Sequence, residues 1–227
     1  MSLSKPRENV SPVKRYFRIK GKDGGGLTYW DKSAEEEKTV GLPFAFVVLD
    51  TLTCVSGFHQ ASKSSIWSNE IRDTRSESLT VRSKDGILAE GLWNDIKDSR
   101  AMKGAKFANS VYVAFKDGDE LVIGNILLSG AAVSEWFDFK KGKSLDSAPG
   151  VSITGFDGPR LSGTNEYFVP VFGTWTPNDL NAATALDETL QDYLSGALSR
   201  KAEEPEDSQP QYTPPPAQAP LMEEPPF

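Results

Sequence analysis

Proline is concentrated at one end of this chain and limits how much of the sequence can fold. Residues 201–227 contain eight of the 15 prolines, together with six acidic residues and one lysine. Proline has no backbone N–H and a fixed φ, so it interrupts helices and sheet interiors. The segment also has too little apolar surface to offset the entropy of ordering it. We therefore predict a disordered, partly polyproline-like tail after one domain of up to about 200 residues.

The body before the tail has the apolar patterns of a β-rich domain. In residues 16–20, Phe17 and Ile19 alternate with more polar neighbours, which predicts a half-buried strand. Phe44 to Leu49 is apolar on both faces and predicts a central strand, with 51–58 as its neighbour. Asp117-Gly118 predicts a tight turn between strands 107–115 and 120–127. Further strands are predicted at 65–72, 78–84, 151–156 and 166–175.

Helical spacing of apolar residues occurs in three places. Leu88, Leu92 and Ile96 predict a helix over 87–101, and residues 129–141 form a second candidate with Val133, Trp136 and Phe137 inward. Thr176 and Pro177 predict the start of an amphipathic helix that continues to about residue 200. The apolar stripe of this last helix consists of Leu180, Ala183, Leu186, Leu190, Tyr193, Leu194, Ala197 and Leu198. These patterns predict a mainly β (β-rich α+β) fold, compatible with an elaborated five-stranded barrel with peripheral helices.

Charge is distributed unevenly along the chain. The formal net charge is −7, from 25 basic and 32 acidic residues. Residues 1–175 contain 23 basic and 22 acidic residues, net +1, whereas residues 176–227 contain 2 and 10, net −8. The acidity therefore belongs to the C-terminal quarter. A nearly neutral body can hold a basic surface, and an anionic tail can occupy that surface until a polyanion displaces it.

The residues give little support to catalysis or to a cofactor. Gly24-Gly25-Gly26 lacks the Lys-Ser/Thr of a phosphate-binding loop. With one cysteine, Cys54, and one histidine, His59, we expect no disulfide, no metal site and no cofactor. No nucleophile motif accompanies His59, so we predict that the protein is not an enzyme. No signal peptide or membrane-spanning apolar segment is evident, which favours the cytoplasm.

Cations alternate with aromatic rings on several predicted strands, and this combination is typical of binding to single-stranded nucleic acid. Cations neutralise phosphates, and exposed rings stack on bases without regard to sequence. Trp30 and Trp67 lie among Gly, Ser and charged residues and are candidate stacking rings. An exposed strand face is also polar in proteins with no such role. The candidate binding residues are Tyr16, Arg18, Lys20, Trp30, Trp67, Arg82, Lys84, Tyr112 and Lys116.

The last residues of the tail form an acidic tip, Glu223-Glu224-Pro225-Pro226-Phe227. A terminal carboxylate beside an apolar ring suits capture by a basic pocket on another protein. The tip resembles that of bacterial and phage single-stranded DNA-binding proteins, in which acidic residues precede a final Pro-Phe. It differs in having two glutamates in place of a run of aspartates.

The β-rich body, the C-terminal amphipathic helix, the proline-rich tail and its acidic tip together resemble a phage-type single-stranded DNA-binding protein. The resemblance implies an oligonucleotide-binding (OB) barrel over 16–175, a flexible arm over 1–15, a packed helix over 176–200 and a partner-binding tail over 201–227. It implies sequence-independent coating of single-stranded DNA in replication, recombination and repair, in the cytoplasm of a host cell. The tip would recruit a polymerase or helicase-primase. A tetramer is not implied, and a homodimer stays open.

Two other interpretations remain open. A non-enzymatic structural or adaptor protein would use the β-domain and the acidic tail to bind protein partners. A nuclease could be assembled from scattered acids such as Asp50, Glu70 and Asp73, although no motif spaces them.

Overall fold

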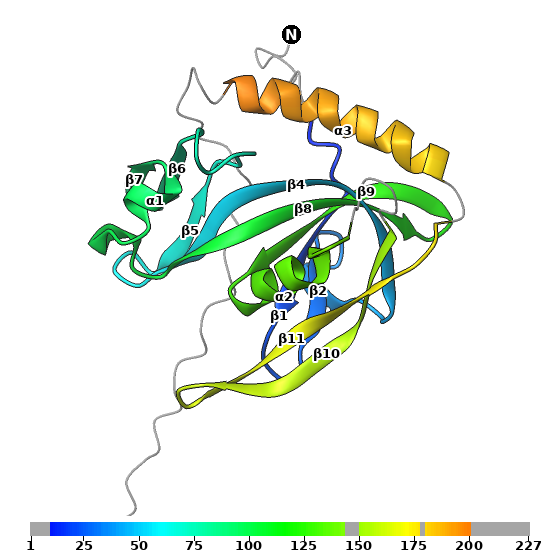
Figure 1. Cartoon of the computed structure of the whole chain (residues 1–227), viewed down its shortest axis with the longest axis horizontal. Helices are drawn as coiled ribbons and strands as arrows, with labels where there is room; N and C mark the ends of the chain where they lie inside the picture. Colours follow the sequence, from blue (N-terminus) through cyan, green and yellow to red (C-terminus); the bar gives the residue numbers. More distant parts are fainter. Residues whose placement is uncertain (1–9, 144–149, 178–179, 201–227) are drawn as a thin grey trace, which may run out of the picture.

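The computed structural model of the chain describes residues 10–143, 150–177 and 180–200 (Figure 1). The sheet order is β3-β2-β1-β9-β8-β4-β5-β6-β7, with β10 paired to β4 and β11 paired to β10. Neighbouring strands are antiparallel except β1 and β9, which are parallel. The strands of the described residues are β1 (Arg15–Lys20), β2 (Gly26–Asp31), β3 (Glu36–Thr39), β4 (Phe44–His59), β5 (Ser64–Ser68), β6 (Leu79–Ser83), β7 (Gly86–Gly91), β8 (Ala105–Asp117), β9 (Glu120–Ser129), β10 (Gly150–Ser162) and β11 (Asn165–Thr174). The helices there are α1 (Trp93–Ile96), the 3-10 helix η1 (Arg100–Met102), α2 (Ala131–Lys140) and α3 (Leu180–Arg200).

The prediction of a mainly β fold with peripheral helices and a C-terminal helix is confirmed. Across the described strands the sheet is curved, but it is not closed into a barrel by a continuous ladder. The β1–β2 turn meets β11 through one backbone hydrogen bond, in which the Phe168 N–H donates to the Gly21 carbonyl at 2.8 Å. None of the described helices is long and apolar enough to cross a membrane.

Residues 44–59 form one continuous strand, so the prediction of two neighbouring strands at 44–49 and 51–58 is wrong. A bulge between Val48 and Asp50 bends the strand without ending it. The first part of β4 pairs with β10 and the last part pairs with β5, while β8 pairs along nearly its whole length. The two long strands β4 and β8 thus connect two halves of the molecule (Figure 1).

The predicted helix over 87–101 is also wrong. Residues 86–91 form β7, and helical structure is limited to the four residues of α1 and the three of η1. Gly86 and Gly91 have φ values of 123° and 146°, which lie outside the helical region and delimit the strand. Leu88 and Ile96 do pack into the same apolar cluster, but from different elements.

The hairpin of β8 and β9, the helix α2 and the pair β10–β11 agree with the predicted elements. Phe137 of α2 is a correction, because it is exposed whereas Val133 and Trp136 are buried as predicted. Of the arm predicted over 1–15, residues 1–9 lie outside the described residues. Val13 packs on an apolar cluster and Arg15 begins β1.

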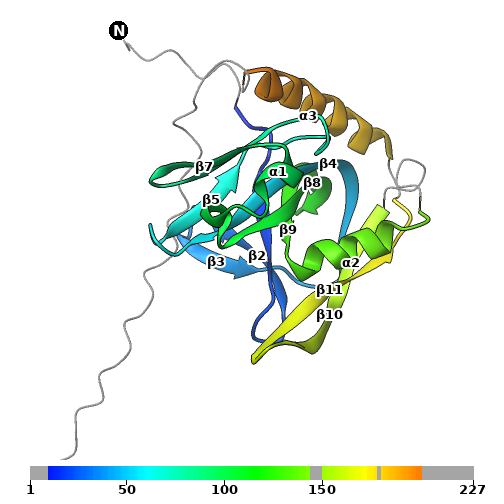
Figure 2. The ribbon, with the colours of Figure 1, turned by 60° about the vertical axis from the view of Figure 1, so that its left-hand side comes forward.

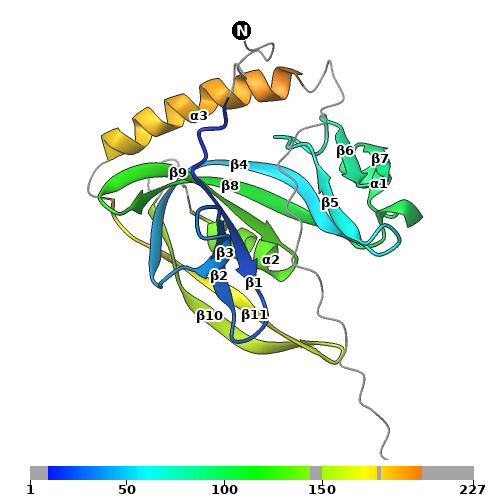
Figure 3. The same ribbon diagram turned by 180° about the vertical axis from the view of Figure 1, so that it is seen from behind.

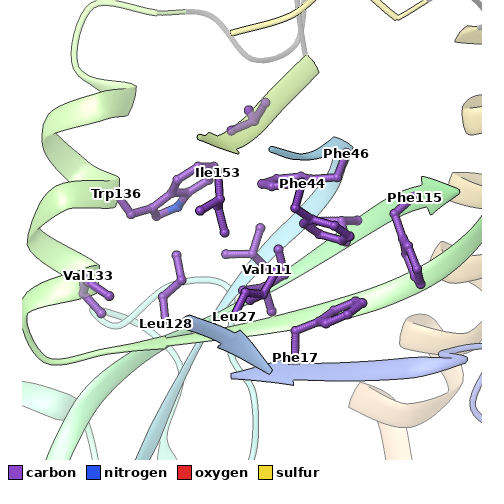
Figure 4. Close-up of a cluster of buried hydrophobic side chains, with 14 of the residues drawn as sticks. Phe17, Leu27, Phe44, Phe46, Val111, Phe115, Leu128, Val133, Trp136 and Ile153 are labelled. Carbon is purple, nitrogen blue, oxygen red and sulfur yellow. The ribbon is translucent and has the colours of Figure 1, made fainter. Parts of the chain in front are cut away.

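The main core lies on the concave side of the sheet, between β1, β4, β8 and the helix α2. Phe17, Phe44 and Phe115 gather there with ring centroids 5.0–5.6 Å apart, and Trp136 of α2 is fully buried (Figure 4). A second cluster holds β5, β6, β7 and α1 together around Val55, Leu79 and Val81. Figure 2 brings this second half forward.

The helix α3 crosses the opposite side of the sheet from α2 (Figure 1). Its Leu190 and Leu194 are buried against Leu52, Tyr112 and Ile123. The predicted apolar stripe is confirmed at these positions and at Ala183, whereas Leu180 is exposed. The predicted N-cap, Thr176, precedes residues 178–179, which lie outside the described residues, as does the whole tail.

Candidate nucleic-acid interface

The sheet has a side turned away from α2, which we name the outer face (Figure 3). Paired residues in a ladder point to the same side, and side chains alternate along each strand. Leu52, which contacts α3, therefore defines the outer face for Cys54, Ser56 and Phe58 along β4. α3 covers only part of this face, so the remaining part is the surface on which to look for the predicted binding residues.

Four adjacent strands form a row across the outer face. Lys106 of β8 is paired with Ser56 of β4, Ser56 with Trp67 of β5, and Trp67 with Arg82 of β6. A large ring thus lies between two cations, with the small Ser56 on one side of it. Phe58, two residues beyond Ser56 on the same face, is 40% exposed. We name Phe58, Trp67, Arg82 and Lys106 the β5–β6 patch.

Two glycines allow the start of β8 to reach β4 closely. A Cβ added at Gly57 would lie 2.1 Å from the Gly104 carbonyl oxygen, and one at Gly104 would lie 2.3 Å from the Phe58 carbonyl oxygen. Gly104 also has φ +94°, which favours glycine. This close contact fixes the beginning of β8 and so places Lys106 in register with Ser56.

The cations of the β5–β6 patch have their charges available. Within the described residues, the side chains of Arg82 and Lys106 form no ion pair with an acid, and neither does the side chain of Lys84, which is outside the patch as defined. The backbone N–H of Lys84 donates to Ser64 Oγ at 3.2 Å, which ties the β6–β7 turn to the start of β5. Lys84 therefore lies next to this patch.

A second set of predicted residues lies on β1 and β2. Tyr16, Arg18 and Lys20 share the outer face of β1, opposite to the buried Phe17. Tyr16 is 52% exposed, and Trp30 of the neighbouring strand is 41% exposed. Partial desolvation raises the pKa of Tyr16, and Tyr193 of α3 and Glu70 raise it further. We name Tyr16, Arg18, Lys20 and Trp30 the β1–β2 patch.

Lys20 is less available to a phosphate than the sequence suggests. Its ammonium forms an ion pair with Glu37 of β3, which also accepts a hydrogen bond from Thr28 Oγ1 at 2.9 Å. Desolvation acts to raise the pKa of Glu37, but the hydrogen bonds from Lys20 and Thr28 outweigh it and hold that pKa below its usual value. Glu37 therefore stays ionised and reduces the positive potential of the β1–β2 patch.

Two predicted binding residues are not placed with the others. Tyr112 is only 5% exposed, lies under α3 and donates its hydroxyl to Glu70 Oε2 at 2.6 Å, so the prediction of an exposed binding residue is wrong. Lys116 is exposed, but it is ten residues along β8 from Lys106, about 33 Å at the rise of a strand. α3 crosses the outer face between these two positions.

The two patches face the same side of the sheet but are separated by three strands, β9, β8 and β4. Four strand spacings from β1 to β5 amount to about 20 Å. Between them the outer-face residues Ser110 and Asn125 are buried, and Asn125 Nδ2 donates to Ser110 Oγ at 2.5 Å. A flexible polyanion of several nucleotides could contact both patches.

Sequence reasoning missed Phe58 and Lys106. Phe58 stands next to the only histidine, and Lys106 follows the segment wrongly predicted as helical. The predicted strand over 51–58 already contains Cys54, Ser56 and Phe58 at alternate positions, so the signal that places Phe58 on the face of Ser56 was present in the sequence.

Catalytic and metal-binding arrangements have little support in the described part of the chain. His59 Nδ1 lies 2.7 Å from Ser62 Oγ, which lies 2.7 Å from Ser64 Oγ, in the β4–β5 turn. No group of three or more His, Cys, Asp or Glu side chains within 10–143, 150–177 and 180–200 could hold a metal ion. The predicted tip, Glu223 to Phe227, lies outside the described residues.

Comparison of the chain with protein-family models, with curated proteins and with solved structures gave no match. The assignment of a function therefore depends on the residues and on their arrangement.

Proposed function

We propose that this protein binds single-stranded DNA without sequence preference and coats it during replication, recombination and repair. The observation that carries the proposal is the row of Lys106, Ser56, Trp67 and Arg82 across four adjacent strands. It offers one ring for a base between two cations for phosphates. Stacking on an aromatic ring contributes about 1–3 kcal/mol per base.

A finer assignment of the fold belongs to the same proposal. The strands around the main core would be an OB-type barrel that is left open, with β5, β6 and β7 as an added half. The single hydrogen bond between Phe168 and Gly21 supports this view, since it joins the two ends that a barrel would bring together. Binding surfaces of such barrels lie on the outer side of the strands and between loops.

The acidic tail would compete with DNA for the outer face. Residues 201–227 have a net charge of −5 and follow directly after α3. Tyr193 of α3, the helix that precedes the tail in the sequence, lies near enough to Tyr16 of the β1–β2 patch to raise its pKa. DNA, with its higher charge density, would displace the tail, and the tip Glu223–Phe227 would then recruit a polymerase or helicase-primase.

The proposal is tested by titrating the full chain with oligo-dT and following tryptophan fluorescence at two salt concentrations. We expect quenching as bases stack, and an affinity that falls with log salt with a slope of about −0.7 per neutralised phosphate. An adaptor protein would give neither response. Intact oligonucleotide after addition of Mg²⁺ would separate binding from nuclease activity.

A further inference from the structure

A second cationic surface lies at the end of α2, on the side of the sheet opposite to the outer face (Figure 1). Lys140 closes the helix, and Lys141 and Lys143 follow it, both exposed. Phe137, one turn earlier, is 47% exposed. We name Phe137, Lys140, Lys141 and Lys143 the α2 lysine surface. The proposed DNA interface makes no use of it.

Aromatic rings hold two of these ammonium groups in place. Lys140 Nζ lies 5.2 Å from the ring centroid of Phe137 and 5.3 Å from that of Trp136. Lys143 Nζ lies 4.3 Å from the ring centroid of Phe139 and donates to the Phe139 carbonyl at 2.6 Å. Cation–π contacts of this kind orient a cation without neutralising it. The surface is therefore ordered and keeps its positive charge.

One acid, Asp138, lies in the same last turn of α2, but within the described residues it forms no ion pair with these lysines. None of the three lysines forms an ion pair there, and the nearby Glu135 is paired with Arg160 at 2.6 Å. Burial lowers the pKa of Lys140, because its ammonium is partly desolvated without a carboxylate partner. An anionic ligand would supply the missing partner.

We propose that the α2 lysine surface binds the C-terminal tip, residues 222–227, of a second copy of this chain. The tip has two glutamates and the terminal carboxylate for the lysines, and the ring of Phe227 for the exposed Phe137. Capture of a terminal carboxylate together with an apolar ring is a recurring mode of peptide recognition. Neighbouring copies would thereby be linked through their tails.

The position of this surface favours a tip over DNA. The surface has one exposed ring and lies across the sheet from Trp67 and Arg82, so a strand bound on the outer face does not pass over it.

The position of the α2 lysine surface also favours the tip of a second copy over the tip of the same chain. The tail starts at the end of α3, whose last half packs on the outer face. The 21 residues from 201 to 221 span about 25 Å on average as a flexible chain, and in the same molecule they would have to pass round the edge of the sheet.

The test uses a fluorescent peptide with the sequence of residues 218–227, titrated with the full chain and followed by anisotropy. Lys141→Glu with Lys143→Glu should weaken binding at least about fivefold, since it reverses two charges in the surface. The control Lys32→Glu changes an exposed lysine on the β2–β3 turn and should leave the affinity unchanged. Phe137→Ser in the protein, or Phe227→Ala in the peptide, should weaken binding through loss of the ring contact.

Self-association provides a second measurement, by sedimentation velocity. Lys141→Glu/Lys143→Glu and Glu223→Lys/Glu224→Lys should each reduce it. A mixture of the two variants should restore hetero-association, because the unchanged tip of the first can bind the unchanged lysines of the second and the reversed charges also match. Failure of the mixture to associate would overturn the proposal that the tip of one copy binds the α2 lysine surface of another.

The peptide experiment requires no DNA, so its outcome is separate from that of the proposed function. Loss of peptide binding in Arg82→Glu/Lys106→Glu, with none in Lys141→Glu/Lys143→Glu, would place the tip on the outer face and overturn the proposal. An equal loss of oligo-dT affinity in both double variants would make the α2 lysines part of the DNA path, which would also overturn it.

Discussion

Trp67 occupies the centre of the β5–β6 patch, and its neighbours are fixed by strand register. Arg82 lies directly opposite on β6, and Ser56 lies opposite on β4. Ser56 is small, Arg82 carries a cation, and Trp67 itself is partly exposed. This arrangement makes Trp67 the residue on which the proposed stacking most depends.

Trp67→Ala is expected to weaken oligo-dT binding by about 1–3 kcal/mol, because one stacked base loses its ring. Anisotropy of a labelled oligonucleotide would measure the change. Trp67→Phe keeps an aromatic face and should recover part of the affinity. Unchanged binding in Trp67→Ala would exclude the β5–β6 patch as the interface.

Tyr112 is buried under α3 and hydrogen-bonded to Glu70, and the pH dependence of folding stability tests this role. Burial, followed by the charge and hydrogen bond of Glu70, raises the pKa of its phenol far above the ordinary value. In the unfolded chain the phenol titrates near pH 10, so above that pH the unfolded state binds fewer protons than the folded state. The contribution of Tyr112 to folding stability is therefore fully present below pH 10 and decreases as the pH rises above 10.

Tyr112→Phe should cost about 1–2 kcal/mol at neutral pH, since Glu70 loses a donor. Above pH 10 the wild type should lose about 1.4 kcal/mol per pH unit through Tyr112, and the variant should not. Urea unfolding of both proteins at pH 8 and pH 11 would measure the difference. A difference that stays constant with pH would contradict the assignment. Oligo-dT affinity should be unaffected in the variant.

Among the elements, α3 is the one whose packing the sequence predicted best. Its apolar residues recur at helical spacing, and Leu190 and Leu194 meet the outer face as that spacing requires. β4 and the segment 86–102 were predicted poorly. Residues 44–49 and 51–58 were predicted as two strands, but the bulge lets one strand continue through both, and Leu88 and Ile96 share a cluster without sharing a helix.

Leu190→Ala should destabilise the protein by about 2–5 kcal/mol, because a fully buried side chain of α3 leaves a cavity against Leu52 and Tyr112. Leu180→Ala, at the exposed start of the same helix, should change stability by no more than about 0.5 kcal/mol. Urea denaturation would compare the two. Equal effects would mean that α3 does not pack as described.

At the scale of the whole molecule, the body and the tail have opposite electrostatic roles in the proposed mechanism. The body has a net charge of +1 over residues 1–175, and the tail has −5 over 201–227. The attached acidic tail has a high local concentration and therefore competes with free DNA for the body. Salt screens both interactions.

Changing Glu203, Glu204, Glu206 and Asp207 to their amides should raise oligo-dT affinity about threefold or more at low salt. The gain should shrink at high salt, where the Debye length is only a few ångströms. Changing Gln209 and Gln211 to Asn preserves the tail's charge and serves as the control. Equal or weaker binding by the amide variant would show that the tail does not compete with DNA.

The sequence alone determined the β-rich class, the β8–β9 hairpin, the helix α3 and the separation of a neutral body from an acidic tail. These features are local, since they depend on periodicity, turn residues and composition. Only the tertiary structure placed Trp67 between Lys106 and Arg82, because residues so far apart along the chain meet through strand register. It also buried Tyr112 and paired Lys20 with Glu37, since burial and ion pairing depend on which strands become neighbours.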